Sequence, residues 1–175
     1  MRIRGEAELF GRRAYRPAER VSREHARGAG AGSIARVDVL LVSPDERTRE
    51  LIALSVRSIE RRLASPLRFR AARDGELGAR AALRDRPDVI VADEIASRAG
   101  AFSLARSIRD DADPYGGVIV ILLERVHDSW LAKWSGADAW FVKPVDPFEL
   151  ADRLLELVTE KGFGDSRSER RTARA

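Results

Sequence analysis

The apolar run from Val89 to Ala92 constrains the fold more than any other stretch of the sequence. Four consecutive apolar or small residues leave no polar face, which is typical of a strand buried on both sides. Such strands belong to parallel sheets whose two faces are covered by helices. Asp93 follows directly, where the strand would leave the sheet at its carboxyl edge. Open α/β sheets place their ligands and their chemistry at that edge.

Four further apolar segments indicate strands of the same sheet. They span residues 37–42, 67–72, 118–123 and 139–142. Apolar residues also recur at helical spacing. This spacing predicts helices over 45–63, 76–84 and 101–108, a helix that holds Trp130 and Trp134 and ends at Gly136, and a last helix from Asp146 that Gly162 ends. Five strands alternating with five helices predict an α/β fold, a flavodoxin-like doubly wound five-stranded parallel sheet.

The positive charge of the chain is concentrated near its two ends. Residues 1–35 hold eight arginines against four glutamates, and residues 162–175 hold four arginines against two acidic residues. The 20 basic and 22 acidic residues of 36–161 leave that segment a net charge of −2. Segment 1–35 is rich in Arg, Gly and Ala and has few large apolar side chains, so it cannot bury enough surface to fold. We therefore predict disordered basic tails at 1–35 and 162–175 around one domain, 36–161, with at most a short helix over 17–27.

The composition excludes several classes of protein. The chain has no cysteine, so neither a disulfide framework nor a thiolate metal site is expected. No apolar run approaches the roughly 18 residues of a membrane span, and the first residues lack the apolar core of a signal peptide. We expect a cytoplasmic protein without a membrane segment.

Three stretches resemble the receiver domain of bacterial response regulators. They are GADAWFVKPVDPFEL at 136–150, PDVIVAD at 87–93, and the Asp-Gly pair at 74–75. The resemblance covers about residues 36–160. It implies that Asp93 is the phosphoacceptor position and that Lys143 pairs with the phosphoryl group. It also places Trp140 at the aromatic switch position and Pro144 at a proline that often follows a cis bond.

The sequence departs from the receiver pattern where the family binds Mg²⁺ and phosphate. Ser43 and Pro44 stand where the family has two acidic residues, and Ile121 to Leu123 offer no hydroxyl at the end of the fourth strand. Phosphoryl transfer to a carboxylate needs a metal that neutralises the developing charge. Near Ser43 and Pro44 in the sequence, only Asp45 and Glu46 could replace the missing metal-binding carboxylates. Helix capping already explains both residues. We expect at most a weak Mg²⁺ site, no certain cofactor, and a protein that works without phosphorylation.

Each candidate residue also has a simpler interpretation. Asp93 is also explained as a polar residue that ends a buried strand, and Lys143 as its salt-bridge partner in a pocket without catalytic function. His127 is expected in a solvated loop, and His25 lies in the predicted N-terminal tail. Neither histidine has a second metal ligand at helical spacing.

The tryptophans suggest a surface for partners. Trp130 and Trp134 are four residues apart and share a helix face, whereas Ala132 and Ser135 suit contact with the sheet. At least one indole, Trp134 in the first place, should be exposed next to Trp140. Core packing is the ordinary role of tryptophan, but exposed aromatic residues are enriched in interaction hot spots. We name Trp130, Trp134 and Trp140 as a candidate partner face, which could also support a homodimer through the fourth helix, fifth strand and fifth helix.

These observations predict a stand-alone receiver-like signalling protein that is not an enzyme. It would act in a phosphorelay by binding a protein partner or a sensor kinase. One alternative is a nucleic-acid-associated regulator that uses the Arg-rich tails. The other is an enzyme on a flavodoxin-like sheet, which is disfavoured because no Gly-rich phosphate loop follows the first strand.

Overall fold

The computed structural model describes residues 36–63, 65–94 and 100–163. The predicted tails, the short helix over 17–27 and His25 lie outside the described residues, apart from the start of the C-terminal segment. No helix in the described part of the chain is both long enough and apolar enough to cross a membrane.

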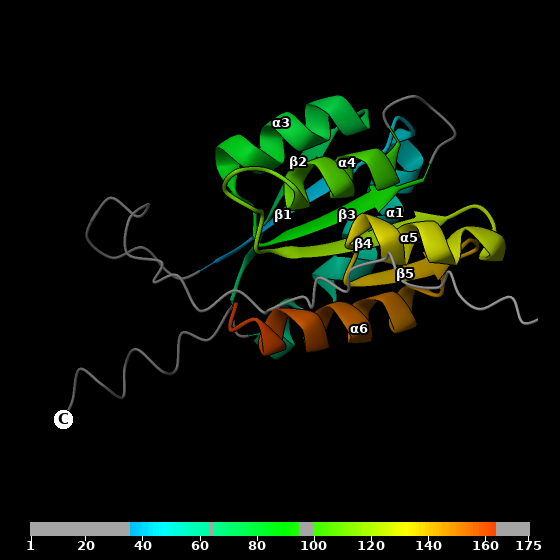
Figure 1. Ribbon diagram of the computed structural model, residues 1–175. Helices are drawn as coiled ribbons and strands as arrows, with labels where there is room; N and C mark the ends of the chain where they lie inside the picture. Colours follow the sequence, from blue (N-terminus) through cyan, green and yellow to red (C-terminus); the bar gives the residue numbers. More distant parts are fainter. Residues whose placement is uncertain (1–35, 64, 95–99, 164–175) are drawn as a thin grey trace, which may run out of the picture. The chain divides into compact units, whose positions relative to one another are not determined.

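The five predicted strands form one parallel sheet (Figure 1). They are β1 (Val37–Val42), β2 (Leu67–Ala72), β3 (Val89–Asp93), β4 (Val118–Leu123) and β5 (Ala139–Val142). Their spatial order is β2-β1-β3-β4-β5, and every neighbouring pair is parallel. This order is that of a flavodoxin-like, doubly wound fold, and the predicted fold class is confirmed.

Helices connect the strands and cover both faces of the sheet. They are α1 (Glu46–Arg57), α2 (Glu60–Leu63), α3 (Gly75–Asp85), α4 (Ala101–Arg109), α5 (Ser129–Ser135) and α6 (Pro147–Glu160). A short 3-10 turn, η1 (Val126–Asp128), precedes α5. The described residues thus contain six α-helices, where the sequence predicted five.

The extra helix arises because the predicted helix over 45–63 is divided near Ser58. The Ser58 backbone N–H and side-chain hydroxyl both donate to the carbonyl of Ser55, at 3.2 and 2.6 Å. Ile59 also donates to a carbonyl three residues back, that of Val56. Such contacts tighten a turn and compete with the α-helical ladder. The expected apolar stripe is nevertheless buried, because Ile52, Val56, Ile59 and Leu63 all lie in one core.

Successive side chains along each strand point to opposite faces of the sheet, which divides the core into two layers. On one face of the sheet, residues such as Leu41 and Val91 pack with α1, α2 and α6. On the other face, residues such as Leu40 and Ile90 pack with α3, α4 and α5. All five residues of β3 are buried, as predicted for a strand covered on both sides.

The last helix begins and ends where the sequence indicated. Asp146 caps α6 by accepting from the backbone N–H groups of Phe148 and Glu149, at 2.7 and 3.1 Å. Gly162 has a positive φ of 70°, and Phe163 N–H donates to the Val158 carbonyl at 2.9 Å. Phe163 is only 5% exposed and packs in the core, although its sequence position predicted a place in the C-terminal tail.

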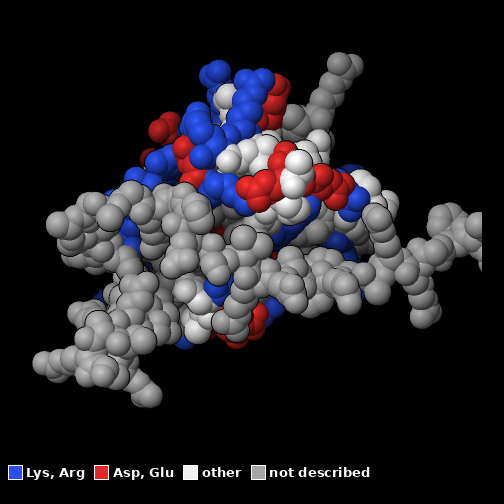
Figure 2. Space-filling model, turned by 60° about the vertical axis from the view of Figure 1, so that its left-hand side comes forward, with Lys and Arg blue, Asp and Glu red and all other residues white. Residues whose placement is uncertain are grey.

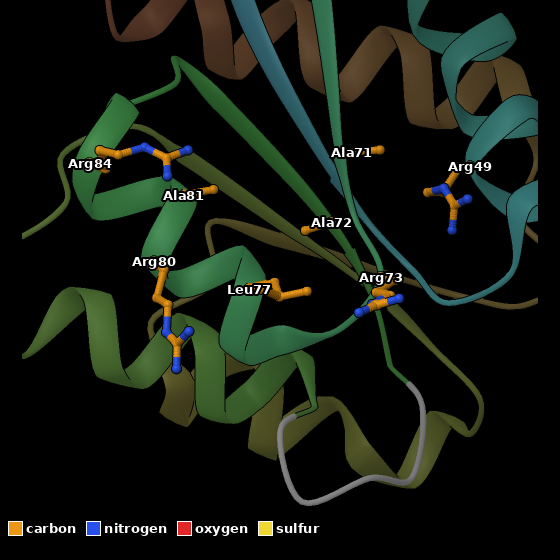
Figure 3. Close-up of a pocket in the computed structure, with 8 residues that line it drawn as sticks. All are labelled: Arg49, Ala71, Ala72, Arg73, Leu77, Arg80, Ala81 and Arg84. Carbon is orange, nitrogen blue, oxygen red and sulfur yellow. The ribbon is translucent and has the colours of Figure 1, made fainter.

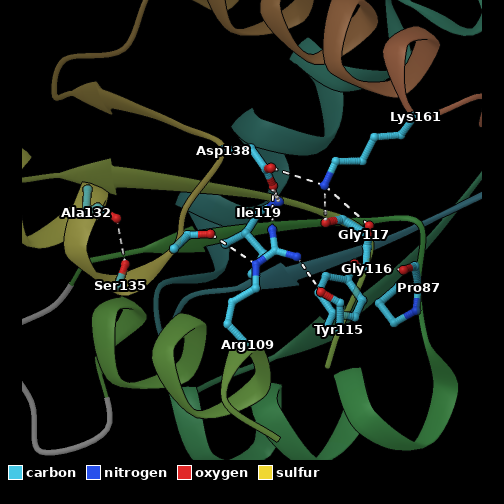
Figure 4. Close-up of polar contacts among 11 residues, drawn as sticks. Pro87, Arg109, Tyr115, Gly116, Gly117, Ile119, Ala132, Ser135, Asp138 and Lys161 are labelled. Atoms are coloured by element: carbon cyan, nitrogen blue, oxygen red, sulfur yellow. Dashed lines mark hydrogen bonds and ion pairs between the residues drawn. The ribbon is translucent and has the colours of Figure 1, made fainter. Parts of the chain in front are cut away.

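A polar network joins the elements at the amino edge of the sheet (Figure 4). Arg109 donates to the Gly136 carbonyl at 3.0 Å and to Asp138 at 2.7 Å. Asp138 also accepts from the backbone N–H of Ile119 at 2.7 Å and pairs with Lys161 at 3.1 Å. Burial holds the pKa of Lys161 below its ordinary value, although Asp138 acts in the opposite direction. No local pattern in the sequence predicted this network.

Candidate functional site

The parallel register of β1 and β3 brings Ser43 and Asp93 together at the carboxyl edge. Val42 of β1 pairs with Ala92 of β3, so the next residues along the two strands, Ser43 and Asp93, are neighbours. The Ser43 hydroxyl donates to Asp93 Oδ2 at 3.0 Å. Lys143 Nζ donates to Asp93 Oδ1 at 2.7 Å. Both oxygens of the Asp93 carboxylate, which is only 2% exposed, therefore already have a donor within the protein.

Lys143 lies between two carboxylates. It comes directly after β5, and its backbone N–H continues the ladder by donating to the Leu123 carbonyl at 2.8 Å. Its ammonium group forms ion pairs with both Asp93 and Glu124. Burial by itself would lower the pKa of Lys143, but the hydrogen bonds to the two carboxylates outweigh it and hold the pKa above its ordinary value. The peptide bond from Lys143 to Pro144 is cis.

Glu124 is a member of this site that sequence reasoning missed. The register pairs Leu123 with Val142, which makes the next residues along the two strands, Glu124 and Lys143, neighbours. An acid directly after one strand and a lysine directly after its neighbour are the signal that could have revealed the pair. Glu94, buried to 8% exposure, accepts from the Glu124 backbone N–H at 3.2 Å and supports the same loop.

Asp45 and Glu46 do not complete a metal site. Asp45 caps α1 by accepting from the backbone N–H and the hydroxyl of Thr48, at 3.0 and 2.6 Å. These hydrogen bonds, the one from the Thr48 hydroxyl first, hold the pKa of Asp45 below its ordinary value. Glu46 lies exposed in the first turn of α1. The capping explanation therefore agrees with the geometry of Asp45, whereas Glu46 only places a negative charge in the first turn of α1.

The described residues at the carboxyl edge do not provide the ligand set of a Mg²⁺ ion. Mg²⁺ requires a near-ideal octahedron of oxygen ligands. Within the described ranges, no group of three or more acidic or histidine side chains is arranged to hold a metal. Pro44 has no donor atom, and Ile121 is fully buried in the apolar layer beside α3, α4 and α5. The Asp93 oxygens are instead bound by Ser43 and Lys143.

The two tryptophans of α5 both lie exposed. Trp130 is 64% exposed and Trp134 is 56% exposed, so the expectation of at least one exposed indole holds for both. Ala132 and Ser135 are fully buried, as their small size indicated. Trp140 is half-buried and packs against the core layer beside α5.

The exposure of Trp134 is limited by a basic side chain of α4. The guanidinium of Arg106 lies 5.0 Å from the centre of the Trp134 ring and also donates to the Trp134 carbonyl at 3.3 Å. Further exposed apolar side chains that sequence reasoning missed are Val126, Val142 and Phe148. His127 lies exposed in η1, as expected for a solvated histidine.

Solved structures with the same architecture are receiver domains. The chemotaxis response regulator CheY4 of Vibrio cholerae is 22% identical, with a TM-score of 0.59 over 70% of this chain and 98% of that one. The receiver domain of the Francisella response regulator 1452 is 21% identical, with a TM-score of 0.60 over 71% and 98%. The receiver domain of sensor histidine kinase PA1611 from Pseudomonas aeruginosa, determined with magnesium in its active-site cleft, is 24% identical, with a TM-score of 0.59 over 71% and 99%. The described domain therefore has the receiver fold.

Curated sequences agree with this class. No family model matches the chain. Two relatives from Mycobacterium tuberculosis, one each from strains CDC 1551 and H37Rv, are 29% identical over 123 residues. The match covers 69% of this chain and 90% of each relative, and both are described as uncharacterized response regulatory proteins. The chain is therefore similar in sequence to response regulatory proteins and has the fold of receiver domains, in agreement with the resemblance that the sequence motifs indicated.

Proposed function

We propose that this receiver domain signals by binding a protein partner in one constitutive conformation, with Asp93 at the phosphoacceptor position but without phosphorylation. Two-component signalling is the setting of its class. How this particular domain is controlled depends on the chemistry of the carboxyl edge. A cytoplasmic location and a protein partner such as a sensor kinase belong to the same proposal.

The double engagement of Asp93 is the observation that supports the proposal. An aspartate that receives a phosphoryl group needs a metal ion beside it to offset the charge of the transferred group. Here Ser43 donates to one oxygen and Lys143 to the other. Because Glu124 also pairs with Lys143, the ammonium group of Lys143 is shared by two carboxylates and lies where a metal ion would offset the charge of Asp93.

The exposed side of α5 is the proposed contact surface. Trp130 and Trp134 present large apolar side chains to solvent, and aromatic anchors of this kind dominate binding energies at protein interfaces. A protein partner, or a second copy of the chain, could cover them. Replacing Trp130 by Ala should then weaken that association by roughly 2 kcal/mol, while the melting temperature stays close to that of the wild type.

Phosphorylation is tested with acetyl phosphate and Mg²⁺ as donor and metal. We expect no gain of a phosphoryl group by intact mass, and no change of Trp140 fluorescence with a beryllofluoride mimic. The Asp93→Asn variant should keep partner binding. Stoichiometric phosphorylation of the wild type that disappears in Asp93→Asn would overturn the proposal.

A gain-of-function variant provides the matched control. Replacing Ser43 and Pro44 by Asp restores two carboxylates beside Asp93, and Leu123→Thr adds a hydroxyl at the end of β4. If the missing groups are the cause, the triple variant should bind Mg²⁺ and accept phosphate measurably better than the wild type. Equal reactivity of the two proteins would show that these three positions do not control phosphorylation.

A further inference from the structure

A basic pocket lies at the free edge of the sheet, between the end of β2 and the helices α1 and α3 (Figure 3). Its volume is about 530 Å³. Four arginines line it, namely Arg49, Arg73, Arg80 and Arg84, together with apolar side chains that include Leu77 and Ala81. No acidic residue of the described chain lines it. Asp93 and Lys143 are not among its lining residues either, so the pocket is independent of the proposed function.

One stripe of α3 provides half of the pocket wall. Leu77, Arg80, Ala81 and Arg84 have the spacing i, i+3, i+4 and i+7, which places them on a single side of a helix. The residues of α3 that are buried, Gly78 and Ala82 among them, belong to a different stripe. In Figure 3, Leu77, Ala81 and Arg84 point from α3 toward β2. The stripe therefore combines an apolar floor with the guanidinium group of Arg84, whereas Arg80 points away from β2 in Figure 3.

The four arginines differ in how well they are neutralised. Arg80 pairs with Glu76, and Arg84 donates to both oxygens of Asp85 at 2.9 Å. Within the described ranges, Arg49 and Arg73 have no carboxylate partner. Arg49 donates to the carbonyl of Ser43 instead. The pocket therefore keeps an excess of positive charge, which an anionic ligand would offset.

We propose that the basic pocket binds a small organic phosphate, such as a nucleotide, with its phosphate on the arginines and its apolar body on Leu77 and Ala81. The planar fork of arginine matches phosphate oxygens bidentately. The volume falls within the roughly 300–1,000 Å³ of small-ligand pockets, which combine an apolar lining with a few placed polar groups. A ligand with only a phosphate, or only an apolar body, would use half of this arrangement.

The surface around α3 favours a small ligand over a nucleic-acid chain. Figure 2 shows basic side chains gathered over the upper part of the displayed face, the height at which α3 lies in Figure 1, with acidic side chains among them. A nucleic-acid backbone requires an extended stripe of positive charge. On the displayed face, acidic side chains interrupt the positive charge, so the basic side chains form no continuous stripe there.

Calorimetric titration of the full chain tests the proposal with three probes: adenosine diphosphate, adenosine and pyrophosphate, at physiological salt and without added metal. We expect the nucleotide to bind at least tenfold more tightly than either adenosine or pyrophosphate. Pyrophosphate binding as tight as that of the nucleotide would exclude a role for the apolar floor and overturn the proposal. Absence of nucleotide binding would overturn it as well.

Charge-reversal variants distinguish the pocket from the many arginines elsewhere in the chain. Arg73→Glu should weaken nucleotide binding at least tenfold, and Arg73→Ala provides a milder version if the first variant is unstable. The matched control is Arg61→Glu, which makes the same charge change at an exposed residue of α2 outside the pocket and should alter affinity less than twofold. Equal effects at the two positions would overturn the assignment. The assignment would also be overturned if a single-stranded oligonucleotide bound more tightly than the nucleotide and lost its affinity in Arg73→Glu. That result would assign the pocket to nucleic acid.

Discussion

At the scale of single residues, Asp93 depends on the partners that neutralise it. A carboxylate that is 2% exposed would carry a large desolvation cost without a cation or donors nearby. Lys143 provides the cation, and the Ser43 hydroxyl and the Lys143 ammonium group both donate hydrogen bonds to Asp93. Lys143 is itself 26% exposed, so its ion pair is neither a surface contact nor a fully buried one. The stability of the pocket should therefore depend more on the lysine than on the charge of the aspartate.

Replacing Lys143 by Met leaves Asp93 and Glu124 without their shared cation. Removing one partner of a buried pair costs more than the pair contributes, because the other charge stays buried. We expect a loss of about 2 kcal/mol in the free energy of unfolding, measured by urea titration. Asp93→Asn, which removes the charge and keeps a side chain that can hydrogen-bond with Ser43, should cost less. The reverse order of the two losses would contradict this account.

Asp85 predicts how the stability responds to acid. Hydrogen bonds from Arg84, and next from Arg70, lower the pKa of Asp85 from 3.8 to about 2. The unfolded chain takes up this proton at higher pH than the folded one. The contribution of Asp85 to stability is therefore complete above pH 3.8 and is lost as the pH falls through about 2. Urea titrations of wild type and Asp85→Asn should converge over this window. A constant difference between them down to pH 2 would show that the carboxylate does not titrate as described.

At the scale of elements, β3 determines whether the domain folds. Ile90 is fully buried in the middle of this strand, so Ile90→Asp would place an unpaired charge in the core. We expect a loss of several kcal/mol, enough to unfold a domain of ordinary stability, by circular dichroism.

The matched control for the strand is the same type of change on an exposed helix position. Leu51 of α1 is 65% exposed, and Leu51→Asp should cost less than about 1 kcal/mol, mainly through helix propensity. If both variants melt at the wild-type temperature, β3 is not a central buried strand.

At the scale of the whole domain, the network at the amino edge joins elements that are distant in sequence. Arg109 of α4 holds Asp138 at the start of β5, and Asp138 in turn holds Lys161 at the end of α6 (Figure 4). Asp138 is 21% exposed and Arg109 is 20% exposed. Removing the guanidinium takes one of three partners from the sheltered Asp138 carboxylate, which keeps the Ile119 N–H and Lys161. It also removes the hydrogen bonds that Arg109 donates to the carbonyls of Gly136 and Tyr115.

Arg109→Met should therefore lower the free energy of unfolding by about 3 kcal/mol, measured by urea titration. The control is Arg153→Met on α6, which removes one surface ion pair with Glu156 and should cost less than about 1 kcal/mol. Losses of similar size in the two variants would show that the network contributes no more than an ordinary surface pair.

The sequence by itself determined the elements and their class. The apolar run that ends at Asp93 predicted a strand buried on both faces, Asp146 predicted the start of the last helix, and the small residues Ala132 and Ser135 predicted which side of α5 faces the sheet. These features depend on neighbours a few positions apart, so they can be inferred from local patterns. The division of the first helix at Ser58 escaped this reasoning, because a serine hydroxyl can bond within a helix or end it.

Only the tertiary structure decided which side chains meet. Ser43 and Asp93 are 50 residues apart, as are Asp93 and Lys143. Their contact results from the strand order, which places β1 beside β3 and leaves only β4 between β3 and β5. The same order set Glu124 against Lys143 and assembled four arginines around one pocket from α1, α3 and the end of β2. Charge and polarity are properties of each residue, whereas the neighbour that satisfies them depends on how the whole chain packs.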